Sequence, residues 1–240
     1  MNKLLQFALA VIIAIGAAAA SVTAGDYAHL NFIGFSKDGR YLAFEEYGVS
    51  DGSGFPYASI YFIDTAKNIY AAPPVTARIE SETATEATVR SRVLVQADKK
   101  LKQFAIVKGN TGKHVVSHKI NDLTIEETET IIRFAEEVDS NYRRGVHELV
   151  LKQVPVSPKE CEAYSVDTVM LQLTLANKDD ETSKVLQKDT SLPQSRGCVL
   201  SYRVQDVYLF KDLIAVFINV YTPGFEGQDM RFMAVTGTIR

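Results

Sequence analysis

The feature that most constrains the fold of this chain is an Asp-Gly turn, Asp38-Gly39, placed between a segment that ends at Phe35 and an apolar segment that starts at Tyr41. Glycine tolerates a positive φ angle, and aspartate can accept a hydrogen bond from the backbone that follows it, so the pair favours a tight reversal. A second apolar segment, 58–64, follows a glycine-rich loop. The sequence therefore predicts an antiparallel β-hairpin unit near the start of the chain.

The first 24 residues have the pattern of an export signal. Lys3 supplies a positive start, Leu4 to Ala20 is almost uninterruptedly apolar, and Val22 and Ala24 are suitable residues before a cleavage site at Gly25. We expect cleavage there, a periplasmic or secreted protein, and no stable membrane anchor after cleavage. An uncleaved anchor is the alternative, but an apolar run of about 17 residues, much of it alanine, is short for a hydrocarbon core of roughly 30 Å.

The chain has two cysteines, Cys161 and Cys198. In an oxidising compartment two thiols usually form one disulfide, and we expect that bridge here. Two separate buried thiols are the alternative. The pair lacks the C-x-x-C spacing of a redox-active site, so we expect a structural bridge.

One helix is expected, over about 84–107. Thr83 and Glu86 have the spacing of a capping box, in which the two side chains satisfy the first free amides of a helix. Gly109 to Gly112 would end it. Before the helix, Pro73-Pro74 predicts an extended linker, because proline cannot donate a ladder hydrogen bond. Apolar residues recur at helical spacing at positions 87, 94, 97, 101, 104 and 105.

From residue 113 onward the pattern is that of strands. Val169 to Leu175 alternates and predicts a half-buried strand with its leucines inward, whereas Leu213 to Tyr221 is apolar on both faces and predicts a central strand. The predicted fold is mainly β with one helix, built of antiparallel hairpin units in a propeller-like or sandwich arrangement. We expect a single exported domain at 25–240, made of a β-hairpin module (26–68), a linker and helix (69–112) and a β region (113–240).

The charge of the chain argues against one class of partner. It has 26 Lys and Arg against 29 Asp and Glu, a formal net charge of −3, and no block of basic residues. Nucleic acid binding needs clustered cations to neutralise phosphates, so no nucleic acid partner is expected.

Two stretches resemble known families. The segment FSKDGRYLAF at 35–44, with IYFID at 60–64, resembles the WD40-like repeat of TolB-type β-propellers over residues 32–64. A longer pattern resembles a family of predicted secreted bacterial proteins, domain of unknown function 2259, and is carried by LNFIGFS at 30–36, GRYLAFEEYG at 39–48 and DGSGFPY at 51–57. The second resemblance implies export and a shared fold, and it implies no activity.

Three patterns are similar to reactive or metal-binding sites, and each lacks a required part. Ser50 lies in a G-x-S-x-G sequence, but a nucleophile elbow needs a helix after the serine, and a loop and a strand follow here. His114 and His118 share a face by their spacing but have no third ligand. Asp51 begins an Asp-Gly-Ser-Gly stretch that could give oxygens to calcium, yet the closing glutamate is missing. We therefore assign no catalytic residue, metal or cofactor.

The hairpin loops are rich in aromatic residues. Phe55 and Tyr57 follow the first loop, and Phe225 lies in a later one. Aromatic residues on loops of a rigid β scaffold are common in recognition surfaces, although rings also fill sheet cores. We expect Asp51, Phe55, Tyr57 and Phe225 to form a binding patch at one end of the sheet.

These features favour an exported binding or protein-interaction module over an enzyme. Its partner would be an unknown protein or small molecule of the cell envelope. One alternative is a periplasmic hydrolase whose carboxylates, for example Glu45 and Glu46, converge only in the folded chain, since a glycosidase needs two acids about 5–10 Å apart. The sequence places its acids at strand ends and turns, where solvated acids usually lie. An envelope structural protein is the other alternative.

Overall fold

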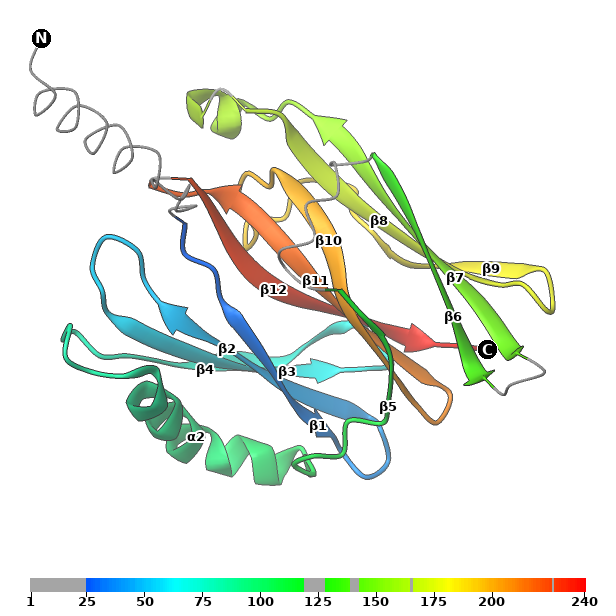
Figure 1. Cartoon of the computed structure of the whole chain (residues 1–240), viewed down its shortest axis with the longest axis horizontal. Coiled ribbons are helices and arrows are strands. Elements are labelled where there is room, and N and C mark those ends of the chain that lie inside the picture. The colour runs from blue at the N-terminus through cyan, green and yellow to red at the C-terminus, as the bar shows by residue number, and fades with distance from the viewer. Residues whose placement is uncertain (1–24, 119–127, 139–142, 165, 226) are drawn as a thin grey trace, which may run out of the picture.

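The computed structural model describes residues 25–240 except 119–127, 139–142, 165 and 226. These residues form three antiparallel sheets of four strands each and one long helix (Figure 1). The leader expected at 1–24 lies outside the described residues.

The three sheets are named by their place in the stack. The N-terminal sheet has the strand order β1 (His29–Phe35), β2 (Tyr41–Val49), β3 (Pro56–Asp64) and β4 (Ile69–Arg78). The central sheet has the order β12 (Gln228–Thr238), β11 (Leu213–Pro223), β10 (Ser201–Phe210) and β5 (Lys113–Ser117). The outer sheet has the order β6 (Glu129–Val138), β7 (Arg143–Val156), β8 (Thr168–Asn177) and β9 (Thr182–Lys188). Helix α2 spans Glu86–Gln103, and a short 3-10 helix, η1, spans Lys159–Tyr164.

The elements stack as four layers: α2, the N-terminal sheet, the central sheet and the outer sheet (Figure 1). A separate hydrophobic core lies at each of the three junctions between layers. The predicted fold class, mainly β with one long helix and antiparallel pairing, is confirmed. The sheets pack face to face, so the sandwich is the arrangement present in the described residues, and the propeller-like one is not.

The Asp38-Gly39 turn forms as predicted and joins β1 to β2. Gly39 has a φ of +87°, which favours glycine, and a Cβ there would lie 2.6 Å from a methyl carbon of Leu213. The Asp38 carboxylate accepts hydrogen bonds from the Ser36 hydroxyl (2.6 Å) and the Arg40 amide (3.0 Å). These bonds, with that from Ser36 the stronger cause, lower the pKa of Asp38.

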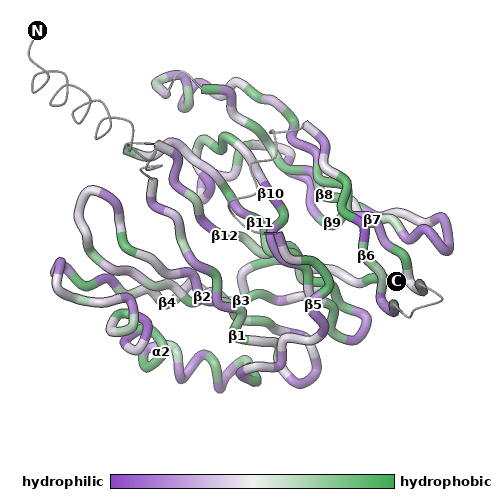
Figure 2. Tube along the Cα trace, in the orientation of Figure 1, coloured by the Kyte–Doolittle hydropathy of each residue, from purple (hydrophilic) through white to green (hydrophobic). Residues whose placement is uncertain are grey.

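Strand β2 shows why the layers assemble in this order. Its side chains alternate between two faces, and hydrophobic residues occur on both. Figure 2 shows hydrophobic residues interspersed with hydrophilic ones along the strands. Leu42 and Phe44 lie in the core shared with the central sheet, while Ala43 lies in the core shared with α2. A strand that is apolar on both faces has to be covered on both, and the helix and the central sheet provide this cover.

Helix α2 is shorter than expected and starts at a different cap. The cap is Thr85, whose hydroxyl accepts a hydrogen bond from the Thr88 amide, and not Thr83. The helix ends before the glycines because Ala105 has a φ of +51°. Its buried residues are Val89, Val93, Ala97 and Leu101, so the expected inward face was only partly right and Ala87 is exposed.

The segment expected to be a linker after residue 68 is strand β4 instead. It pairs with β3 at the edge of the N-terminal sheet, and the register slips between Ile60 and Phe62, opposite Pro73 and Pro74. Prolines are tolerated at edges and irregular positions because no ladder hydrogen bond is required of them there. The two prolines therefore mark an edge strand.

The outer sheet buries its leucine face against the central sheet, as predicted. Leu171, Leu173 and Leu175 are all buried in this core, and each contributes roughly 2 kcal/mol by burial. Strand β11 is central, again as predicted, between β10 and β12. Cys161 in η1 and Cys198 before β10 form the expected disulfide, with 5.6 Å between their Cα atoms.

We expect the disulfide to stabilise the domain by about 4 kcal/mol, because it closes a long loop in the unfolded chain. Replacing Cys161 and Cys198 together by serine should lower the free energy of unfolding by that amount in urea titrations. Adding reductant should destabilise the wild type to the same extent and leave the double variant unchanged. Equal stability of oxidised and reduced wild type would contradict the prediction.

Candidate functional site

A cavity of about 700 Å³ lies where the three sheets meet. The N-terminal sheet supplies one wall, β11 and β12 of the central sheet supply another, and β9 with the segment after it supplies the third. Its volume is within the range of small-ligand sites. The cavity is lined by Glu46, Tyr61, Ile63, Asn68, Ile69, Tyr70, Pro74, Gln187, Pro193, Ser195, Arg196, Val220, Thr222, Arg231, Phe232, Met233 and Ala234.

Two adjacent glutamates in β2 point to opposite faces of the N-terminal sheet, and both are buried. Glu45 faces α2, where Arg90 binds both of its oxygens at 2.8 and 3.1 Å. Glu46 faces the central sheet and the cavity. The expectation that these acids are solvated was wrong, because each lies under a packed layer.

Glu46 lacks a close cationic partner of its own. One carboxylate oxygen accepts a hydrogen bond from the Phe232 amide at 2.6 Å, and the other lies 4.0 Å from Nε of Arg231. Burial raises the pKa of Glu46 to about 7; the Phe232 amide and the Arg231 charge oppose the rise, and the Asp26 charge adds to it. The cavity therefore contains a carboxyl group that can change its charge near neutral pH.

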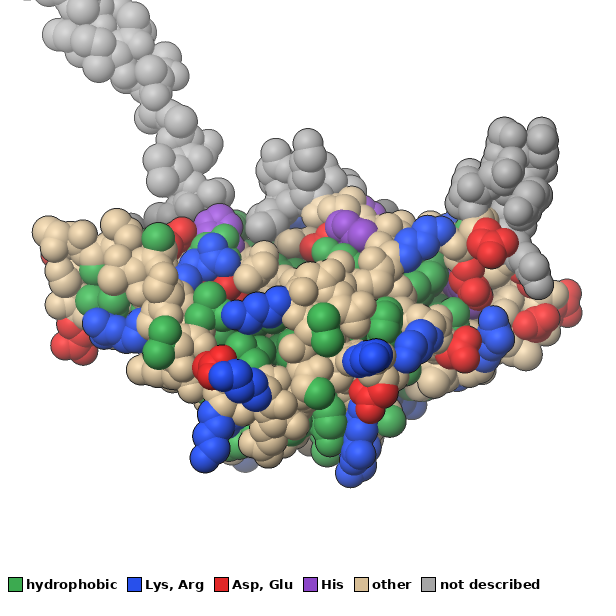
Figure 3. Space-filling model, turned by 90° about the horizontal axis from the view of Figure 1, so that it is seen from below, with side chains coloured by type: hydrophobic (Ala, Val, Ile, Leu, Met, Phe, Trp, Pro, Cys, Tyr) green, Lys and Arg blue, Asp and Glu red, His purple; other side chains and the backbone are tan. Residues whose placement is uncertain are grey.

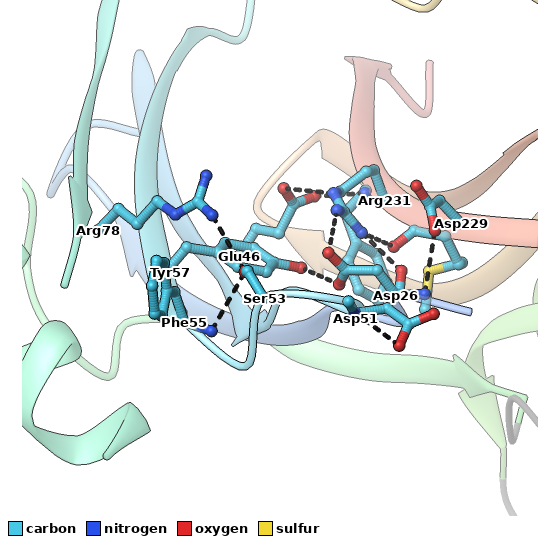
Figure 4. Close-up of polar contacts among 12 residues, drawn as sticks. Asp26, Glu46, Asp51, Ser53, Phe55, Tyr57, Arg78, Asp229 and Arg231 are labelled. Carbon is cyan, nitrogen blue, oxygen red and sulfur yellow. Dashed lines mark hydrogen bonds and ion pairs between the residues drawn. The ribbon is translucent and has the colours of Figure 1, made fainter. Parts of the chain in front are cut away.

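Arg231 is held mainly by Asp26, as Figure 4 shows. Its Nη2 binds the Asp26 carboxylate at 2.7 Å, and its Nη1 donates to the Asp26 carbonyl at 2.6 Å. The Tyr57 hydroxyl donates to the same carboxylate at 2.8 Å, and the guanidinium lies 5.0 Å from the Tyr57 ring centre. The charge of Arg231 is thus balanced by Asp26, which leaves the charge of Glu46 only partly compensated.

Arg196, the second arginine of the cavity, is also paired. It binds the Asp189 carboxylate at 2.6 Å and donates to the Tyr202 hydroxyl at 2.7 Å. Burial lowers the pKa of Arg196, but its hydrogen bond to the Asp189 carboxylate and the neighbouring charges outweigh burial, so that the pKa is raised. Because both guanidiniums have their own carboxylates, the cavity is a poor site for an anion.

Two tyrosines form the aromatic wall. The Tyr61 and Tyr70 rings lie 5.8 Å apart, and Tyr61 stacks on Phe44 at 4.9 Å. Burial raises the pKa of Tyr61, so its hydroxyl stays protonated. Tyr70 is 51% exposed although it is large and aromatic. A half-exposed ring at the mouth of a cavity is available for stacking with a ligand.

The loop residues expected to form a binding patch have different surroundings. Asp51 is exposed and caps the Gly52 amide at 2.9 Å. Phe55 lies 5.3 Å from the Arg78 guanidinium, and Tyr57 is engaged with Asp26 (Figure 4). Phe225 is 88% exposed. A shared patch of these residues stays a prediction.

The other candidate motifs have structural surroundings. Ser50 lies in the β2–β3 hairpin loop, so the strand–serine–helix elbow is not formed there. His114 binds Asp206 at 2.8 Å and stacks on Tyr208, while His118 binds a backbone carbonyl. Among the residues that the structure describes, no group of three or more His, Cys, Asp or Glu could hold a metal ion.

Most of the residues that line the cavity were not predicted from the sequence. Glu46 and its neighbour were recognised only as acids, and Tyr70, Arg196 and Arg231 were not singled out. One signal was present, because two consecutive glutamates interrupt a strand that is otherwise apolar on both faces. An acid on each face of a buried strand requires a partner on each face.

The surface does not suggest a polyanion partner. On the face in Figure 3, basic side chains lie among acidic and neutral ones and do not form a single block. None of the helices in the described ranges combines the length and hydropathy needed to cross a membrane.

Comparison with known proteins gives one match. The model of a family described as predicted secreted protein (DUF2259) matches residues 43–238. No curated protein and no solved structure matches the chain.

The raised pKa of Glu46 predicts how stability depends on pH. The folded protein favours the neutral form of the Glu46 carboxyl more than the unfolded chain does. The contribution of this group to the free energy of unfolding is therefore fully present below the ordinary pKa of 4.5 and is lost as the pH rises through about 7. Glu46→Gln stays neutral at every pH. Relative to this variant, the wild type should lose about 3 kcal/mol of unfolding free energy between about pH 4.5 and pH 8, measured by urea titration.

Glu80→Gln, at an exposed position, is the matched control and should follow the wild type across the series. A difference between Glu46→Gln and the wild type that does not change with pH would contradict the prediction.

Proposed function

This chain belongs to the DUF2259 family of predicted secreted proteins, and we propose that it is an exported binding module whose ligand occupies the three-sheet cavity. The observation that carries the proposal is Glu46, a 4% exposed carboxyl group in a cavity of about 700 Å³ whose two arginines are already paired. Burying an incompletely paired acid is costly, and such costs are concentrated at functional sites.

The cavity supports binding better than hydrolysis by paired carboxylates. Glu46 is the one acid among the described residues that line it, since Asp26 and Asp189 lie behind their arginines. A glycosidase requires a second carboxylate that faces the same substrate. The aromatic wall, the amide side chains and the single carboxyl group are instead typical of a recognition site.

A second contact surface is part of the proposal. Phe225 is 88% exposed on the β11–β12 hairpin, the largest exposure among the large hydrophobic residues described. Such a ring suits contact with a protein partner, and Asp51, Phe55 and Tyr57 of the β2–β3 hairpin are the other expected contributors. This loop surface is independent of the cavity.

The proposal predicts that blocking the cavity abolishes binding. Ser195 is exposed at the rim, so Ser195→Trp should fill the entrance and leave the cores intact. In a thermal-shift screen of small molecules and short peptides, compounds that raise the melting temperature of the wild type should have no effect on this variant. Ser191→Trp, in the same segment but not lining the cavity, is the control and should respond as the wild type does.

Two results would overturn the proposal. One is a screen in which no compound stabilises the wild type. The other is a set of stabilising compounds that act equally on Ser195→Trp, which would place binding elsewhere, for example at the Phe225 surface.

A further inference from the structure

Strand β12 lies at the edge of the central sheet, and most of the backbone amides on its free side donate hydrogen bonds to groups outside the sheet. The Met230 amide donates to the Asp26 carbonyl at 3.0 Å, the Phe232 amide donates to Glu46 at 2.6 Å, and the Thr236 amide donates to the Asn68 side chain at 2.9 Å. These donors are spaced at multiples of two residues, as expected for amides that face one side of a strand. All three therefore point away from β11, which is the only sheet neighbour of β12 among the strands that the structure describes.

Ala234 is the exception in this series. It lies midway between Phe232 and Thr236, and the pairing of β12 with β11 has no irregularity along its length. Its amide therefore faces the same free edge. Among the described residues, no group outside the sheet accepts a hydrogen bond from it, and Ala234 lines the cavity. The cavity thus exposes a backbone donor of an edge strand.

The chain itself shows what this edge can bind. Residues 26–28 run alongside the start of β12, with a parallel bridge between Tyr27 and Met230 and a hydrogen bond from the Ala28 amide to the Met230 carbonyl at 3.0 Å. An extended segment therefore already pairs with this edge immediately before the cavity. Unpaired strand edges commonly accept a further strand.

We propose that the cavity binds an extended peptide that adds a short strand to β12 at Ala234 and places a positive charge near Glu46. This inference rests on the proposed function, because it names the ligand class of the same cavity. The peptide would accept a hydrogen bond from the Ala234 amide and donate one to an outward carbonyl of β12.

The dimensions and walls of the cavity suit such a ligand. From Phe232 to Thr236 the edge is roughly 13 Å long at about 3.3 Å per residue, which is enough for three or four residues of an extended peptide. Side chains alternate along a strand, so neighbouring residues of the peptide would face opposite walls. One wall carries Tyr61 and Tyr70, and the other carries Pro193 and Arg196.

The charges of the site favour a basic peptide. The charged and titratable groups around Glu46 are Arg231 on β12, Asp26 before β1, and Tyr57, Tyr61 and Tyr70 on the N-terminal sheet. Arg231 and Asp26 neutralise each other, so a lysine or an N-terminal ammonium would be the matching partner for Glu46. The positive charge of that group would also lie close to the rings of Tyr61 and Tyr70.

A proline at position 234 tests the backbone contact. Ala234→Pro removes the outward amide, and it should fold because that amide makes no ladder bond to β11. Ala234→Ser keeps the amide and is the matched control. The probe is a fluorescein-labelled library of tetrapeptides with one lysine, measured by fluorescence anisotropy. Peptides that bind the wild type and the serine variant should bind the proline variant at least about tenfold more weakly.

The peptide supplies the complementary tests. Methylating every second backbone nitrogen of the peptide should weaken binding about tenfold for one of the two alternate sets of nitrogens, namely the set that faces β12. Replacing the lysine of the peptide by norleucine should weaken binding to the wild type but not to Glu46→Gln. In hydrogen exchange, the Ala234 amide should exchange faster than those of Phe232 and Thr236, and a bound peptide should slow it. A protected Ala234 amide in the free protein would overturn the inference.

The outcomes separate this inference from the proposed function. Ligands that fail on Ser195→Trp yet bind Ala234→Pro as tightly as the wild type would refute strand addition and leave a binding cavity. The same holds if none of the peptides binds while other compounds do. Ligands that are indifferent to Ser195→Trp would refute both.

Discussion

The architecture depends on a single constraint, which is that β11 must be covered on both faces. Val216 and Ile218 face the outer sheet, while Ala215 and Phe217 face the N-terminal sheet, and all four are fully buried. A strand of this kind cannot stand at a surface, so two further sheets have to pack against the central one. Asn219 interrupts the apolar run and is held by a hydrogen bond to Gln205. The cavity lies at the rim of this stack, where twisted sheets diverge and their side chains do not fill the space between them.

The parts of the fold that could be predicted from sequence are those set by local patterns. The Asp38-Gly39 turn, the inward leucines of β8 and the central place of β11 follow from turn chemistry and alternation. The parts that were missed depend on distant residues. Two prolines were taken for a linker because their tolerance at an edge is visible only once β3 lies beside them. The cap of α2 was displaced by two residues, since Thr83 and Thr85 are equally suitable by type.

The site was less predictable than the fold for the same reason. Glu46 meets the Phe232 amide 186 positions later, and Asp26 meets Arg231 across 205 positions. No short-range pattern encodes such pairs. Phe55 and Tyr57 could be singled out because they lie two residues apart beside one loop, whereas the residues of the cavity come from three sheets. A buried acid that breaks the alternation of a strand is a conflict between local pattern and fold, and conflicts of this kind tend to mark function.

The disulfide has a consequence for when the cavity is completed. Ser195 and Arg196, which form part of its entrance, lie three and two residues before Cys198, and the bond ties this segment to η1 on the outer sheet. Cysteine thiols form disulfides in an oxidising compartment and remain reduced in the cytosol. The entrance therefore gains its covalent brace only once the chain has left the cell interior. Export is therefore a step of maturation as well as of transport, because a chain retained in the cytosol would lack the disulfide that restrains the cavity entrance.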